Sequence, residues 1–230
     1  MILMTIVVSG LTVLALVKLD HILQLDVLDV SLIMLGMVLL ITGIRTAVQS
    51  RKKESVYFLK TKRIGFRTWN TKDLPLAMIL WGDPKVTELI DARGQLSKEQ
   101  VGKRLDSEIA MQEASGVQYW PIFLIRNHEF LGCCGLRPYK ADEGIFELGV
   151  HLCSNQWGKG YAEEACRTVI HHAFDQLKVH GLFAGHNPSN IRSRHLLQKL
   201  GFSHTHNQFF EPTGLHHPSY FLSQDSASDI

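Results

Sequence analysis

The chain contains a strand-like run, a glycine-rich loop and an amphipathic helix that follow one another without a break, and this order restricts its possible folds. GIFELGVHLC (144–153) is typical of a strand, and the loop after it, SNQWGKG, places Gly158 and Gly160 one residue apart. From Ala162 to Leu177, apolar residues recur at steps of three and four, which predicts a helix with one apolar face. Such a helix must bury that face against another layer, so the sequence predicts an α/β domain.

The flanking sequence supplies further strands and helices. Helices are expected at 73–80, 97–114 and 190–200, and strands at 63–69, 119–126, 129–139, 182–186, 202–210 and 218–223. The residues expected to cap these helices are Asn70 or Thr71, Ser97, Ser189 or Asn190, and Gly201 in a left-handed conformation. This order predicts a mixed sheet with helices on both faces and at least one strand–helix–strand crossover.

The glycine loop has the local chemistry of an anion site. Backbone amides at the start of a helix are unpaired and carry partial positive charge, and glycines allow the backbone to approach a phosphate closely. The loop nevertheless matches neither common nucleotide motif. G-x-x-x-x-G-K-[ST] is absent, and Glu163 stands where G-x-G-x-x-G requires its third glycine.

A second segment, downstream, gives the loop its context. WGKGYAEEA (157–165) followed by NPSNIRSRHLLQKLGF (187–202) resembles the GCN5-related N-acetyltransferases (GNAT), in particular their ribosomal-protein N-terminal acetyltransferase branch. The resemblance extends over about residues 56–223. It implies the GNAT fold over 63–223, with a mixed, mostly antiparallel central sheet, and leaves 224–230 as a polar, disordered tail.

The resemblance also implies an activity and a binding site. The activity is transfer of an acetyl group from acetyl-coenzyme A, with no metal, to a primary amine of a protein N-terminus, a polyamine or a small amine metabolite. The loop amides would hold the pyrophosphate, the end of the preceding strand would splay from its neighbour to bind the pantetheine arm, and the start of the late helix would contact the same arm. Carried over to this chain, the binding residues are Val150, His151, Leu152, Trp157, Gly158, Lys159, Gly160, Tyr161, Ala162, Asn190 and Ser193.

The catalytic groups are less completely specified. Many family members protonate the departing thiolate with a tyrosine, but the matching residue here is Leu197, which leaves Ser193 as the acid. A hydrogen bond from Ser193 to a helix carbonyl is the alternative role for that hydroxyl. The base is expected to be Glu147, which alternation places on one strand face with His151 and whose pKa a cleft would raise. His151, His186 or a chain of water molecules are the alternatives.

Other reactive side chains are expected to have structural roles. No cysteine or carboxylate accompanies the histidines at a recognisable metal-ligand spacing, so no metal site is expected at His204, His206, His216 or His217. The four cysteines contain no C-x-x-C pair, which favours a reducing compartment. Cys133 and Cys134 are adjacent in a strand and should point to opposite faces of the sheet.

The first fifty residues have a different composition. Residues 1–17 and 30–44 carry no charge, acidic residues lie between them, and a basic cluster follows from Arg45 to Arg63. This pattern predicts a transmembrane hairpin over 1–49 and a basic connector over 50–62, with both ends cytoplasmic. The alternative is a pair of helices packed on a soluble core or on a partner, in a cytoplasmic protein.

Two other functions fit the same residues. An acyl-coenzyme A sensor without catalysis would keep the loop and Asn190, and a membrane-anchored interaction module would use the hairpin as its functional part. A net charge of +2 excludes neither, but it gives no indication of a nucleic-acid partner. The sequence does not specify the oligomeric state or the acceptor.

Overall fold

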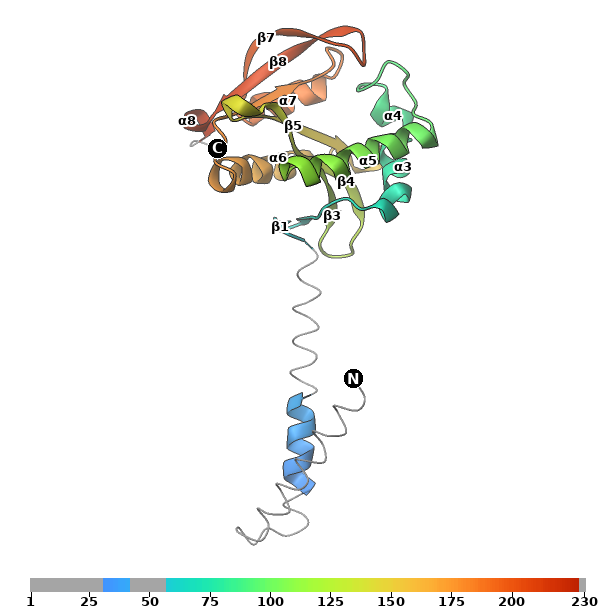
Figure 1. Cartoon of the computed structure of the whole chain (residues 1–230), viewed down its shortest axis with the longest axis vertical. Coiled ribbons are helices and arrows are strands. Elements are labelled where there is room, and N and C mark those ends of the chain that lie inside the picture. The colour runs from blue at the N-terminus through green and yellow to red at the C-terminus, as the bar shows by residue number, and fades with distance from the viewer. Residues whose placement is uncertain (1–30, 42–56, 228–230) are drawn as a thin grey trace. The chain divides into compact units, whose positions relative to one another are not determined.

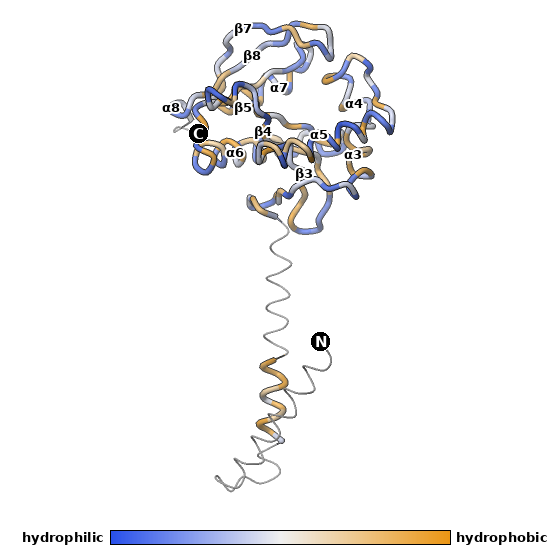
Figure 2. Tube along the Cα trace, viewed as in Figure 1, coloured by the Kyte–Doolittle hydropathy of each residue, from blue (hydrophilic) through white to orange (hydrophobic). Residues whose placement is uncertain are grey.

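The computed structural model describes residues 31–41 and 57–227. The chain divides into two compact units, Met1–Val56 and Tyr57–Ile230. In the first unit, residues 31–41 form a mostly hydrophobic helix (Figure 2). Its large apolar side chains are mostly exposed. None of the helices in the described ranges is long and apolar enough to cross a membrane. Most of the predicted hairpin (1–49) and of the connector (50–62) lies outside those ranges.

The second unit is built on one eight-stranded sheet (Figure 1). In chain order its strands are β1 (Leu59–Lys60), β2 (Ile64–Phe66), β3 (Tyr119–Leu124), β4 (Phe130–Lys140), β5 (Ile145–Leu152), β6 (Gly181–Gly185), β7 (Ser203–Phe210) and β8 (Leu215–Ser223). Their spatial order is β1-β2-β3-β4-β5-β6-β8-β7. Only β5 and β6 pair in parallel, across the predicted strand–helix–strand crossover, so the predicted mixed and mostly antiparallel sheet is confirmed.

The helices of the second unit are α3 (Leu74–Trp81), α4 (Pro84–Thr87), α5 (Lys98–Ser115), α6 (Tyr161–His171), α7 (Ile191–Lys199) and α8 (Gln224–Ala227). Asn70 caps the 3-10 turn before α3, Ser97 caps α5 with Gln100 in a capping box, and Gly201 is left-handed after α7, as predicted. The predicted helix to Leu177 is α6 plus a π-helical turn, His172–Gln176. Part of the expected disordered tail is the short helix α8.

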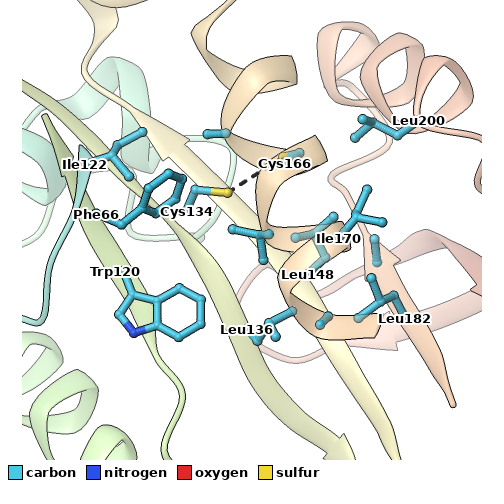
Figure 3. Close-up of a cluster of buried hydrophobic side chains, with 14 of the residues drawn as sticks. Phe66, Trp120, Ile122, Cys134, Leu136, Leu148, Cys166, Ile170, Leu182 and Leu200 are labelled. Atoms are coloured by element: carbon cyan, nitrogen blue, oxygen red, sulfur yellow. Dashed lines mark hydrogen bonds between the residues drawn. The ribbon is translucent and has the colours of Figure 1, made fainter. Parts of the chain in front are cut away.

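Two apolar cores lie on the two faces of the sheet. One core contains Cys134 and residues of α6 and α7, and Cys134 Sγ lies 3.8 Å from Cys166 Sγ (Figure 3). The other contains Cys133 and residues of α3 and α5. Adjacent strand residues therefore face opposite layers, as predicted, and helices cover both faces.

The pairing of β5 creates the opening that the site uses. β5 pairs with β4 along its whole length, as far as Leu152. Its pairing with β6 ends at Glu147, opposite Phe183, and the rest of β6 pairs only with β8. The two strands thus separate after Glu147, which is the splay that the resemblance implies.

Candidate active site

A cleft of about 290 Å³ opens beside the separated end of β5. Its walls come from β5, the glycine loop, the first turn of α6, the first turns of α7, and the α4 region. The lining residues are Lys85, Val86, Leu89, Ile90, Val150, His151, Leu152, Gln156, Trp157, Gly158, Gly160, Tyr161, Ala162, Glu163, Asn190, Arg192, Ser193 and Leu196. The structure therefore brings together every coenzyme-binding residue predicted from the sequence except Lys159.

The glycine loop has the backbone that its sequence predicts. Gly158 and Gly160 have φ values of 76° and 79°, a conformation that other residues adopt at a cost of roughly 1–2 kcal/mol. Gly160 is also the N-cap of α6, and no side chain caps that helix. The amides of its first turn, at Tyr161 and Ala162, are therefore available to an anion in the cleft.

Two carboxylates in the first turn of α6 would repel an anion, but both form ion pairs with basic side chains. Glu163 pairs with Lys199 at 2.6 Å and with Arg167 at 3.1 Å, and the hydrogen bond from Lys199 is the main cause of its lowered pKa. Glu164 pairs with Arg63 at 2.6 Å. Burial raises the pKa of Glu164, but hydrogen bonds from Thr61 and Arg63 outweigh it, and the net pKa is lowered.

The side chain of Lys159 lies outside the cleft lining. Its side chain donates to Gln156 Oε1 at 2.9 Å, and Gln156 in turn donates to Glu129 Oε1 at 2.6 Å. Arg63 donates to the Lys159 carbonyl at 3.3 Å. These bonds fix the loop to its surroundings and keep the Lys159 ammonium out of the cleft lining.

The open edge of β5 presents backbone groups to the cleft. The Cys153 amide donates to the Leu131 carbonyl of β4 at 2.9 Å. Because alternate residues of an antiparallel strand bond to the same neighbour, the backbone groups of His151 also hydrogen-bond to β4. The backbone amides and carbonyls of Val150 and Leu152 then point away from β4, and the Leu152 carbonyl accepts from the Trp157 indole at 2.9 Å. The amide and carbonyl of Val150 face the gap that opens where β6 separates.

The start of α7 supplies the third wall. Asn190 caps the helix by accepting from the Ser193 amide at 3.0 Å. The half-buried Ser193 hydroxyl has no hydrogen-bond partner among the described residues, so the alternative bond to a helix carbonyl is not formed. Leu197, at the position of the family tyrosine, is buried in the core.

Glu147 lies outside the cleft lining, four residues before His151 on the same face of β5. Burial raises the pKa of its carboxyl, and Arg137 and a hydrogen bond from Tyr119 oppose that effect. The pKa of Glu147 is thus raised as expected, but the cause is burial in a polar cluster outside the cleft lining.

The two histidines considered as alternative bases are poorly suited. Burial, with Arg104 and Arg137 nearby, holds the pKa of His151 well below its usual range, and the Trp81 indole donates to its Nδ1 at 3.3 Å. His186 is outside the cleft lining, where its Nδ1 lies 2.7 Å from the Asn187 carbonyl oxygen. The histidines weighed as metal ligands, His204, His206, His216 and His217, lie on β7 and β8, and the described residues contain no cluster of three or more potential metal ligands.

The α4 wall of the cleft and the ring contacts of two arginines were not predicted from the sequence. Asp83 caps α4 through its side chain and Pro84 begins the helix, a start signal that the sequence displays. Arg192 lies over the Trp157 ring at 4.9 Å and lines the cleft, and Arg63 lies over the Tyr161 ring at 4.7 Å. No local pattern indicates these arginine contacts, because Arg63 and Tyr161 are far apart in the sequence.

Comparisons with known proteins agree with this geometry. The family model described as "Acetyltransferase (GNAT) domain" matches residues 63–203. "Uncharacterized N-acetyltransferase p20" of Bacillus licheniformis is 27% identical over 144 residues, which is 63% of this chain and 81% of that protein. "Probable N-acetyltransferase YjcK" of Bacillus subtilis (strain 168) is 42% identical over 117 residues, or 50% of this chain and 64% of that protein.

Solved structures share the fold. A GNAT-family acetyltransferase from Bacillus anthracis superposes with a TM-score of 0.63 at 20% identity, over 73% of this chain and 98% of that chain. The ribosomal L7/L12 alpha-N-protein acetyltransferase RimL in complex with coenzyme A has a TM-score of 0.63 at 13% identity, over 72% and 97%. The relatives and solved structures named above are all described as acetyltransferases. The alternative function, an acyl-coenzyme A sensor without catalysis, is therefore not favoured.

Proposed function

Since the chain belongs to the acetyltransferase (GNAT) domain family, we propose that it transfers the acetyl group of acetyl-coenzyme A to a primary amine in the cleft described above. The observation that carries this proposal is the convergence of three features on one cleft. These are the uncapped first turn of α6 after two left-handed glycines, the open edge of β5, and the Ser193 hydroxyl, which has no partner in the described part of the chain.

The residues present fit the coenzyme that the family uses. The amides from Trp157 to Ala162 would bind the pyrophosphate, and the absence of a free negative charge in that turn supports this assignment. Arg192 and Lys85, which line the cleft, add positive charge. The amide and carbonyl of Val150, with Asn190, would bind the pantetheine arm.

Acetyl-coenzyme A supplies an acyl group already activated as a thioester, and the chain has to manage the protons. In the net reaction a C–N bond forms, the C–S bond breaks, and the proton lost by the amine balances the one gained by the thiolate. We assign stabilisation of the developing oxyanion to the Val150 amide, because it faces the gap beside β5.

Glu147 and Ser193 are assigned the two proton transfers. Glu147 accepts the amine proton through water, and its raised pKa brings it closer to the pH at which a base works best. Ser193 donates to the leaving sulfur, since its hydroxyl has no other partner among the described residues.

The acceptor is a primary amine on a protein N-terminus, a polyamine or a small metabolite. RimL, which shares this fold, is described as an alpha-N-protein acetyltransferase, so N-terminal peptides are the first acceptors to test. We further propose that the uncharged runs 1–17 and 30–44 tether the enzyme to the cytoplasmic face of a membrane.

Thiol release from acetyl-coenzyme A by the full chain, over a panel of amines and N-terminal peptides, tests the proposal. Mass spectrometry of each product should show the addition of one acetyl group to the amine nitrogen. Coenzyme binding without acetylation of any amine would leave a binding module as the better account.

A further inference from the structure

A polar cluster lies on the face of the sheet covered by α3 and α5. Glu108 of α5, which is fully buried, accepts from the Tyr119 amide at 2.9 Å and forms an ion pair with Arg137 of β4. The Arg137 guanidinium also lies over the Tyr119 ring at 4.2 Å. These contacts neutralise one negative and one positive charge and leave Arg104 and Glu147 as the other charged members of the cluster.

Arg104 of α5 is not matched in the same way. Its Nε is buried and has no hydrogen-bond partner, and no carboxylate of the described residues lies within 4.0 Å of its guanidinium. The guanidinium lies over the Trp81 ring at 4.8 Å. Burial and the neighbouring Arg137 lower the pKa of Arg104, while Glu108 opposes them. The carboxylates of Glu108 and Glu147 act on this partly exposed guanidinium only at longer range, so an anion that bonds to it directly would satisfy its buried Nε.

The Arg104 guanidinium is not part of the cleft lining, but two side-chain contacts connect it to the cleft. Trp81, on which it lies, donates to Nδ1 of His151 at 3.3 Å, and His151 lines the cleft beside Val150. The Tyr119 ring, part of the same cluster, lies 5.6 Å from the His151 ring. A group bound at Arg104 would therefore be two side chains away from the strand end where the acetyl group is expected.

We propose that Arg104 binds a carboxylate of the acceptor, so that the preferred acceptor is an amine that carries a carboxylate a few bonds from its nitrogen. This inference rests on the proposed function and specifies its substrate class. One guanidinium with a single charge matches a carboxylate monoanion, which it can bind through two parallel hydrogen bonds, better than a phosphate dianion. The amine could belong to a free amino acid or to a peptide whose first residue is acidic.

The test compares matched acceptors on the full chain. Glycine, β-alanine and γ-aminobutyrate are each measured against the corresponding amide, and peptides that begin with Glu are measured against the same peptides with Gln. Aminoethyl phosphate and putrescine serve as phosphate-bearing and cationic acceptors. We expect at least one carboxylate-bearing acceptor to exceed its amide by roughly tenfold or more in kcat/KM. A preference among the free amino acids identifies a free amino acid as the acceptor, and a preference among the peptides identifies a peptide N-terminus.

The variants are Arg104→Gln and Arg104→Lys, with Lys103→Gln as the control. Lys103 is the adjacent cation on α5, pairs with Glu99 on the surface, and lies in neither the cluster nor the cleft. Arg104→Gln should raise KM for carboxylate-bearing acceptors by roughly tenfold and leave the amides and the KM of acetyl-coenzyme A unchanged. Arg104→Lys should restore part of the loss, and Lys103→Gln should have no effect. Thermal unfolding of each variant identifies any that fail to fold.

Three results overturn the inference while the proposed function stands. They are equal rates for acids and amides, a preference for aminoethyl phosphate or putrescine, and an equal loss on every acceptor in Arg104→Gln. If no amine is acetylated at all, stabilisation of the full chain against heat by glutarate provides a separate measure. If glutarate stabilises the unmodified chain and Lys103→Gln but not Arg104→Gln, the carboxylate site is supported without the activity. If glutarate does not stabilise the unmodified chain, the site is overturned as well.

Discussion

Ser193 is the residue on which the proposed chemistry depends most. It replaces a tyrosine that many relatives place one turn later, where this chain has the buried Leu197. Its amide is used in capping α7, but its hydroxyl has no partner in the described part of the chain. A hydroxyl left free at the wall of a cleft is better explained by a ligand than by helix stability.

Ser193→Ala should therefore lower kcat by roughly a hundredfold, the lower end of the range for a general acid, and leave the Kd of coenzyme A unchanged. Steady-state kinetics and calorimetry on the full chain measure the two quantities. Ser189→Ala is the matched control, because Ser189 is exposed just before α7 and outside the cleft lining. An unchanged kcat in Ser193→Ala would remove this residue as the acid.

At the scale of elements, α6 is held at its start by ion pairs that reach other parts of the sequence. Glu163 binds Lys199 at the end of α7, and Glu164 binds Arg63 beside β2. The pKa values of both carboxyls are lowered in the folded chain from the usual 4.5. A carboxyl whose pKa is lower in the folded chain than in the unfolded chain stabilises the fold at pH values above its unfolded pKa. That contribution is lost as the pH falls through its folded pKa.

The double variant Glu163→Gln/Glu164→Gln should consequently lose stability near neutral pH and show a flatter decline between about pH 5 and pH 3. The thermal midpoint, recorded across this range, is the measurement. Glu99→Gln, which removes an exposed carboxylate of α5, should follow the unmodified chain. Parallel curves for the double variant and the unmodified chain would mean that these pairs do not contribute to stability in this range.

Elements that depend on local signals were predictable from the sequence, and those that depend on distant contacts were not. Asn70, Ser97 and Gly201 mark helix ends through their own side chains or backbone, and all three predictions are confirmed. β1 has two residues and exists only because it pairs with β2, so its sequence gives no periodic signal. The neighbours of Glu147 come from α5, β3 and β4, and no local pattern specifies that arrangement.

At the scale of the whole molecule, the N-terminal unit differs from the catalytic unit in composition. The helix at 31–41 exposes its leucines at 57–65% of their surface, namely Leu32, Leu35, Leu39 and Leu40. Exposed apolar side chains in such a row favour contact with lipid or protein rather than water. This helix lies within the uncharged run 30–44, which together with the uncharged run 1–17 is the basis of the proposed tether.

If the tether is correct, the full chain should sediment with membranes, and a chain that begins at Tyr57 should remain in the supernatant. Fractionation by ultracentrifugation is the measurement. Leu35→Arg/Leu39→Arg in the full chain is a control of unchanged length and should shift the protein toward the supernatant, because charge is costly inside a bilayer. A full chain that stays in the supernatant without any such change would contradict the tether.

The assembled cleft is proposed to join the glycine loop, β5 and α7 into one acetyl-coenzyme A site. Calorimetric titration of coenzyme A into the full chain tests it most directly when Gly160→Val is compared with Gly116→Val. Both glycines are left-handed, at φ values of 79° and 72°, but Gly116 ends α5 and lies outside the cleft lining. Both variants should lose similar stability, and only Gly160→Val should weaken coenzyme binding, by roughly tenfold or more. Equal affinity in the two variants, or no binding by the unmodified chain, would contradict the account.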